Sequence, residues 1–256
     1  MPLSIDINCD MGEDEDNKGI ERDLRLLGYV SSANIACGFH AGNENTMRTL
    51  VKECRRQHKS IGAHPSFDDR KNFGRTEVRL SNKEIYELIL KQLKIIGRIT
   101  SEEDCVLQHV KPHGALYNMA AKNAKMANAI ARAVFDYDPD LVFVGLAGSH
   151  LITEALATGL KVSREAFADR GYEPDATLRS RSKEKALLAD TQSMLDQVLM
   201  ICKEKKVIAS DGSKISIEAD SICIHSDGIH ALEFASQLKS FLNSHNINIQ
   251  SILSNE

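Results

Sequence analysis

The stretch HVKPHGALYN, residues 109–118, follows an apolar run and places two histidines, a lysine, a tyrosine and an asparagine within ten positions. The preceding apolar run is typical of a buried strand. Groups that transfer protons or form hydrogen bonds are useful where such a strand ends, because binding residues often lie on the loops that leave a sheet. The glycine at position 114 suits a tight turn that brings backbone close to a ligand. This stretch therefore predicts one wall of a binding pocket.

Seven strand-like runs occur along the chain, and segments with the periodicity of amphipathic helices separate them. The clearest helix is expected at residues 81–99, where Ser81 and Glu84 form a capping box. Strands that alternate with helices predict a parallel sheet with helical crossovers, so we expect an α/β fold. The expected strands are residues 3–9, 32–38, 60–66, 106–112, 141–147, 160–167 and 221–227.

The length and composition of the chain restrict its class. With 256 residues, of which 42% are hydrophobic, and no long linker, we expect a single domain over residues 1–256. The net charge of -4 offers no electrostatic reason for binding nucleic acid or an acidic membrane surface. No apolar run approaches the ~18 residues that cross a bilayer, and the N-terminal residues lack signal-peptide features. We therefore expect a cytoplasmic protein whose partners are small molecules or other proteins.

Polar and charged residues gather where the expected strands end. In a barrel of parallel strands, the active site forms at the carboxyl ends of the strands and in the loops that leave them. Clusters far apart in the chain are therefore expected to meet at one mouth, although the fifth strand contributes only Ser149 and His150. The candidate site residues are Asn8, Asp10, Glu13, His40, His64, Arg75, Lys111, His113, Glu165, Asp169, Arg170 and His225, with Asp68 and Asp227 beside them.

Each candidate also has a structural interpretation. A lone strand histidine such as His64 is more often a hydrogen-bonded core residue than a ligand. Asp10 begins an acidic segment and also fits the role of a turn or N-cap residue. The expected convergence at one mouth favours the functional interpretation of both residues.

The charged candidates likewise allow two interpretations. Lys111 is either solvated or buried near the mouth, where it holds an anionic group or takes a lowered pKa. Arg75 either pairs on the surface or binds a carboxylate or phosphate in bidentate fashion. Glu165, Asp169 and Arg170 form either an internal salt-bridge network or part of the site.

Six sequence elements stand in a specific order: DINCDMGE, ANIACGFHAGN, IGAHPSFDDRKNFGR, HVKPHGALYN, EAFADRGY and ICIHSD. Together they resemble the lactam-utilisation proteins, which form the A subunit of the bacterial ATP-dependent 5-oxoprolinase. The resemblance runs from residue 3 to about residue 245 and covers nearly the whole chain. It implies a seven-stranded (β/α) barrel of the glycoside hydrolase and deacetylase type, similar to a TIM barrel.

The same resemblance implies hydrolysis of the lactam 5-oxo-L-proline (pyroglutamate) to L-glutamate, with ATP as co-substrate and the B and C subunits of 5-oxoprolinase as partners. The chain has no GxxxxGK[ST] phosphate loop, so ATP is expected either at the barrel mouth or mainly on the partner subunits.

The chemistry of lactam hydrolysis suggests roles for the candidates. Asp10 or His64 is the expected general base, and Lys111 with His113 is expected to stabilise a phosphoryl or oxyanion group. Arg75 or Arg170 is expected to hold the substrate carboxylate. The remaining candidates, expected to bind substrate, are Asn8, Glu13, His40, Glu165, Asp169 and His225.

The chain departs from the usual family pattern at Asn43, at Thr76 and at residues 226–229, which allows a shift in substrate preference. Two other functions fit the same pocket. One is a metal-dependent deacetylase-like hydrolase with a divalent ion on Asp10, His64 and His113, although no second histidine follows His64 at the usual four-residue spacing. The other is a non-catalytic component that binds a lactam or amino acid and regulates a partner.

Overall fold

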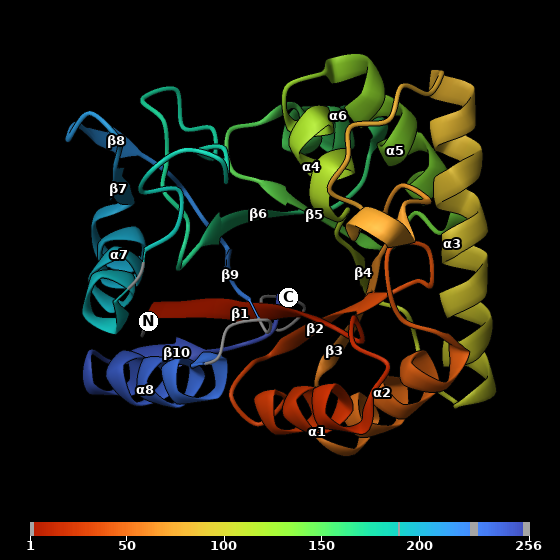
Figure 1. The fold of residues 1–256 in the computed structure, drawn as a ribbon, viewed down its shortest axis with the longest axis horizontal. Coiled ribbons are helices and arrows are strands. Elements are labelled where there is room, and N and C mark those ends of the chain that lie inside the picture. The colour runs from red at the N-terminus through yellow and green to blue at the C-terminus, as the bar shows by residue number, and fades with distance from the viewer. Residues whose placement is uncertain (1–2, 189, 226–229, 253–256) are drawn as a thin grey trace.

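Seven parallel strands form a closed barrel in the computed structural model, which describes residues 3–188, 190–225 and 230–252. The ring closes because β1 pairs with both β2 and β9 (Figure 1). The predicted seven-stranded (β/α) barrel is therefore confirmed. Its strands are β1 (Leu3–Met11), β2 (Ser32–Ala36), β3 (Ser60–His64), β4 (His109–Val110), β5 (Val142–Leu146), β6 (Val162–Phe167) and β9 (Ser221–Ile224).

The strands differ from the expected ranges mainly at their ends. β4 is much shorter than the expected range 106–112, and Pro112, which has no backbone N–H, cannot extend its ladder. The backbone N–H of Lys111 still donates to the carbonyl oxygen of Ala63 at 2.9 Å, which holds Lys111 at the strand end. β9 ends at Ile224, and residues 226–229, which include Asp227 and the last family departure, lie outside the described residues.

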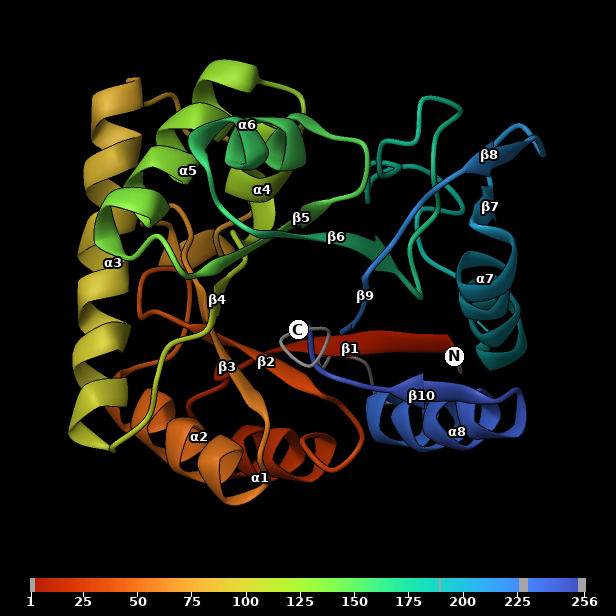
Figure 2. The same cartoon turned by 180° about the vertical axis from the view of Figure 1, so that it is seen from behind.

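Helices surround the barrel on its outer side (Figures 1 and 2). The predicted capping box is confirmed at the start of α3, where the Glu84 carboxylate accepts the Ser81 backbone N–H at 2.7 Å. No helix in the described part of the chain is long and apolar enough to span a membrane. The helices are α1 (Asn17–Leu26), α2 (Glu44–Arg56), α3 (Asn82–Glu102), α4 (Gly114–Ala121), α5 (Ala124–Tyr137), α6 (His150–Thr158), α7 (Thr191–Glu204) and α8 (Ala231–Ser244), with the short 3-10 helix η1 (Arg70–Asn72).

Three short strands were not expected from the sequence. β7 (Lys206–Ile208) and β8 (Lys214–Ser216) form an antiparallel hairpin beside α7 (Figure 2). Its connecting segment contains Asp211 and Gly212, a dipeptide typical of hairpin turns. β10 (Ile247–Ile249) pairs in parallel with the start of β1, outside the closed ring.

The interior of the barrel is polar, unlike the branched apolar filling of many such barrels. Along β1, the buried residues Ile7 and Cys9 belong to the apolar core, while Asp6, Asn8 and Asp10 alternate with them and accept hydrogen bonds from side chains of the neighbouring strand β2. This alternation follows from the two-residue period of a strand. The polar side chains at the mouth therefore continue a polar network that runs through the barrel.

His109 lies in this interior and is completely buried. Its Nε2 is 2.8 Å from Asn34 Oδ1 and donates a hydrogen bond to it, because an amide oxygen only accepts. A Cβ atom at Gly62 would lie 2.0 Å from this nitrogen, so only glycine fits opposite the imidazole. Burial, followed by the charges of Lys111 and His64, lowers the pKa of His109 to about 3.

We predict that His109 makes the fold sensitive to acid. In the unfolded chain its pKa is about 6.5, so below that pH the unfolded state binds a proton that the folded state does not take up until about pH 3. The free energy of unfolding should therefore decrease as the pH is lowered through this window. His109 alone should account for a decrease of about 2 kcal/mol between pH 7 and pH 5. A His109→Gln variant keeps an N–H donor for Asn34 and should lose that part of the slope in urea unfolding measurements. Equal slopes in both proteins would contradict the assignment.

Candidate functional site

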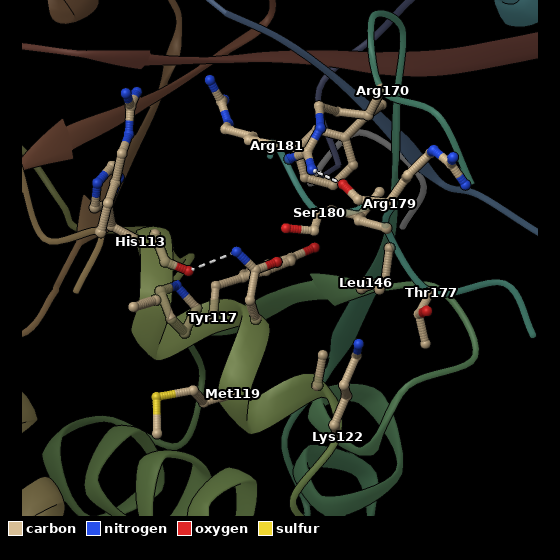
Figure 3. Close-up of a pocket in the computed structure, with 18 of the residues that line it drawn as sticks. His113, Tyr117, Met119, Lys122, Leu146, Arg170, Thr177, Arg179, Ser180 and Arg181 are labelled. Carbon is tan, nitrogen blue, oxygen red and sulfur yellow. Dashed lines mark hydrogen bonds between the residues drawn. The ribbon is translucent and has the colours of Figure 1, made fainter. Parts of the chain in front are cut away.

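A pocket of about 630 Å³ opens at the carboxyl ends of the barrel strands, within the usual size range of small-molecule sites. In Figure 3, α4 with Tyr117, and Lys122 just after this helix, lie on one side, and the segment that carries Arg170, Arg179 and Arg181 lies on the other. The structure brings eight of the predicted site residues into this lining: Asp10, Glu13, His64, Arg75, Lys111, His113, Arg170 and His225.

The ammonium group of Lys111 lies at the base of the pocket, and the residue is 2% exposed. Its Nζ is 2.9 Å from Asp10 Oδ1 and 2.8 Å from Glu165 Oε1. It also donates to Asn8 Oδ1 at 3.2 Å and to Cys223 Sγ at 3.0 Å. Four acceptors therefore surround the three N–H donors of this group.

These contacts decide the charge of Lys111 and Asp10. Burial lowers the pKa of Lys111, but the Asp10, Cys223 and Glu165 side chains outweigh it and raise the pKa well above its usual value. The expected alternative of a lowered lysine pKa was therefore wrong. Burial raises the pKa of Asp10, but His64 and Lys111 outweigh it, so the pKa of this carboxyl falls well below its usual range. Both groups are charged at neutral pH.

His64 and His113 face each other beside this ion pair. His64 Nδ1 is 2.7 Å from the Lys111 carbonyl oxygen, and His113 Nε2 is 2.9 Å from the Phe73 carbonyl oxygen. The two remaining ring nitrogens, His64 Nε2 and His113 Nδ1, are 2.9 Å apart. Asp10 Oδ2 lies 3.2 Å from His64 Nε2, so the carboxylate joins the imidazole pair to the lysine.

His40 and Glu13 extend this group. The His40 ring stacks on the His113 ring with centroids 3.8 Å apart. Its Nε2 is 3.1 Å from Glu13 Oε1, which is also 3.4 Å from His113 Nδ1. Burial, and then the neighbouring His64, lowers the pKa of His40 well below its usual value, while burial raises the pKa of Glu13.

Glu165 on β6 and the two charged residues that follow this strand, Asp169 and Arg170, do not form the single salt-bridge network that the sequence allowed. Glu165 pairs with Lys111, whereas Asp169 accepts from His225 Nδ1 at 2.8 Å. Arg170 instead donates to two backbone carbonyl oxygens, at 2.7 Å to Arg179 and 3.4 Å to Ala186. Burial lowers the pKa of His225, but Asp169 outweighs it and raises this pKa.

Four predicted site residues contact the lining without belonging to it. Asn8 and Glu165 contact Lys111, His40 contacts Glu13, and Asp169 contacts His225. Asp68 lies at the surface on the segment after β3, and Ser149 caps α6 rather than facing the pocket. These two residues are therefore not brought into the site.

Sequence reasoning missed three residues that complete the site. Tyr117 donates to Glu165 Oε2 at 2.7 Å, and Asn34 donates to both Asp10 and Asn8. Cys223 contacts Lys111 Nζ. All three lie within the six sequence elements, which is the signal that could have marked them as candidates. A linear pattern does not indicate which side chains they contact.

Among the residues that the structure describes, two groups of side chains place enough ligand atoms close together to hold a metal ion. One consists of Glu13, His40, His64 and His113, and the other of Asp10, Cys223 and His225. Imidazole, thiolate and carboxylate groups all bind transition metals, so the chemistry of both sets fits such an ion.

The profile of the LamB/YcsF family matches residues 5–256. The chain is 46% identical over 247 residues to a Staphylococcus carnosus protein named as the A subunit of 5-oxoprolinase, a match that covers 96% of this chain and 98% of the relative. A Staphylococcus aureus protein of the same name is 46% identical over 250 residues, or 98% of this chain and 100% of the relative.

Solved structures agree with this relationship. A lactam utilization protein from Thermus thermophilus superposes with a TM-score of 0.89 at 35% identity, covering 98% of this chain and 100% of that one. A family 4 carbohydrate esterase from Streptomyces lividans, at 11% identity and a TM-score of 0.53 over 98% of this chain and 93% of the esterase, shares the fold. The barrel, the full-length profile match and these identities lead to one conclusion: the chain belongs to the LamB/YcsF family.

Proposed function

We propose that this protein is the A subunit of a 5-oxoprolinase, which hydrolyses 5-oxo-L-proline to L-glutamate with ATP as co-substrate and with B and C subunits as partners. The supporting observation is the charged centre of Asp10, Lys111 and Glu165 at the base of a pocket, in a chain 46% identical to proteins that carry this name. The pocket volume of about 630 Å³ accommodates a small lactam with room for a phosphoryl group.

The reaction needs activation because a five-membered lactam is a resonance-stabilised amide. Transfer of the γ-phosphoryl group of ATP to the lactam oxygen makes C5 electrophilic and releases ADP. Water then adds to C5 and loses a proton to a base, and the C5–N bond breaks as the nitrogen takes up a proton. A second water releases phosphate and leaves the side-chain carboxylate of glutamate.

The charged centre suits this chemistry. Asp10 is ionised and lies at the pocket, where it can accept a proton from water, and His64 is the alternative base. Lys111 donates to protein acceptors on all sides, so it acts on the substrate through its charge, which favours negative charge on an oxyanion or phosphoryl group. Glu165, which accepts from Tyr117, fixes the position of the ammonium group from β6.

Arg75 is the better candidate for the substrate carboxylate. Arg170 uses its guanidinium to hold the Arg179 and Ala186 carbonyl oxygens, which gives it a structural role. Arg75 lines the pocket, is exposed, and stacks over the Phe73 ring at 4.8 Å. A planar guanidinium held in this way matches the bidentate geometry of a carboxylate.

Reconstitution tests the proposed function directly. We expect the purified chain, mixed with the B and C subunits, ATP and 5-oxoproline, to form glutamate and ADP at a rate far above that of B and C alone. Glutamate is measured by chromatography and ADP by a coupled assay. Binding of the chain to B and C without added turnover would instead support a regulatory role.

Substitutions at the charged centre should stop turnover in the same assay. Asp10→Ala, His64→Ala, Lys111→Ala and His113→Ala should each lower glutamate formation at least ~10-fold, because each removes a charge or proton carrier. The exposed His150→Ala variant is the matched control and should keep full activity. Circular dichroism establishes that each variant is folded. Wild-type activity in all four variants would refute the assignment of this pocket as the active site.

Substitution of Arg75 should separate binding from chemistry. We expect Arg75→Ala to raise KM for 5-oxoproline roughly 10-fold or more with a smaller change in kcat, since a carboxylate contact forms before the reaction. Steady-state kinetics at saturating ATP measures both constants. An unchanged KM would show that Arg75 does not bind the substrate carboxylate. The comparison variant is Arg75→Lys, which keeps the positive charge but lacks the bidentate guanidinium group.

A further inference from the structure

We propose that His40, His64, His113 and Glu13 bind one divalent transition-metal cation, with zinc as the best chemical match. The proposal concerns this chain alone and does not depend on the 5-oxoprolinase reaction. It rests on where the protons of three buried imidazole rings must lie.

The contact between His64 and His113 joins two hydrogen-bond acceptors. A backbone carbonyl oxygen only accepts, so His64 Nδ1 and His113 Nε2, which contact the Lys111 and Phe73 carbonyls, both carry protons. In the neutral rings the other nitrogens then have lone pairs, and these nitrogens face each other at 2.9 Å. Such a contact needs a proton or a cation between the rings.

His40 presents the same problem against Glu13. The Ser66 hydroxyl donates to the Phe67 carbonyl oxygen at 2.9 Å, so its oxygen accepts from His40 Nδ1 at 2.9 Å. The lone pair of His40 Nε2 therefore points at Glu13 Oε1, another acceptor, at 3.1 Å. Two extra protons are needed to satisfy both contacts, and one divalent cation supplies the same positive charge.

The spacing of the four ligand atoms suits such a cation. They all lie within 4.8 Å of one another, and the contacts of Glu13 Oε1 with His40 and His113 are 3.1 and 3.4 Å. A tetrahedral zinc site with bonds of about 2.1 Å spaces its ligands about 3.4 Å apart. Three imidazole nitrogens and one carboxylate oxygen form a donor set that zinc favours.

The surroundings of the rings also resemble those of metal ligands. Metal-binding histidines usually donate their second N–H to a carbonyl or another fixed acceptor, and all three rings do so. Gly74, with a φ of +64°, makes room for this arrangement, because a Cβ there would lie 2.9 Å from His40 Cβ and 3.0 Å from His113 Cδ2. The glycine therefore leaves room for the His40 and His113 rings to lie beside each other.

The second group of possible ligands is a poorer site. Its Asp10 and Cys223 both accept from Lys111 Nζ, at 2.9 and 3.0 Å, so a cation on them would lie against an ammonium group. The rings of the first group instead contact a hydroxyl, backbone carbonyl oxygens, carboxylates and one another, and this group is the one we assign. A cation there takes the lone pair of His64 and leaves Asp10 as the residue that accepts a proton from water.

Metal titration of the tag-free, chelator-treated protein tests this site. We expect one equivalent of zinc by isothermal titration calorimetry, a cobalt absorption spectrum typical of tetrahedral nitrogen-rich coordination, and a rise in Tm on adding zinc. His40→Ala and His113→Ala should weaken binding roughly 100-fold or more. Cys223→Ser and His150→Ala are the controls and should bind as the wild type does.

Several outcomes would overturn the proposal. They are a folded wild-type chain that binds no stoichiometric metal, undiminished binding in folded His40→Ala and His113→Ala variants, or loss of binding in Cys223→Ser. If the alanine variants do not fold, the cobalt spectrum of the wild type decides, and an octahedral spectrum rejects the assignment. Because the titration contains no partner protein, ATP or lactam, its result is separate from the proposed function.

Discussion

The ion pairs of Lys111 with Asp10 and Glu165 are the contacts on which the mouth of the barrel depends. An unpaired ammonium group inside a closed ring would cost on the order of several kcal/mol, so each carboxylate is needed where it stands. The three residues come from the ends of β4, β1 and β6, and their contacts therefore tie separate strands together across the ring. The pocket floor is anchored to three strands for this reason, and Lys111 and Asp10 are charged at neutral pH.

The backbone of Lys111 is as important as its side chain. Its N–H completes the ladder to Ala63, and its carbonyl oxygen accepts from His64 and so selects the protonated nitrogen of that ring. Asp10 contacts both the lysine and the other nitrogen of His64. The charged centre and the histidine group are thus one connected structure, in which His64 and Lys111 together keep Asp10 charged and the lysine carbonyl sets the orientation of His64.

Much of the architecture was predictable because local rules generate it. Alternating strand and helix patterns predicted the parallel, helix-covered strands of the barrel, and Ser81 with Glu84 predicted the start of α3. The β7 and β8 hairpin was missed although Asp211 and Gly212 marked its turn. The length of β4 was overestimated, since the apolar run around it does not show where strand pairing stops.

Sequence patterns were enough to predict that polar residues follow the strands and therefore share one end of a parallel barrel. The folded structure was needed to identify which of them meet: Asp10 with Lys111, Tyr117 with Glu165, and Arg170 with backbone carbonyls rather than with a carboxylate. It also decided that Lys111 stays charged. A linear pattern records periodicity and neighbours along the chain, whereas pKa values and hydrogen-bond partners depend on burial and on distances across the ring.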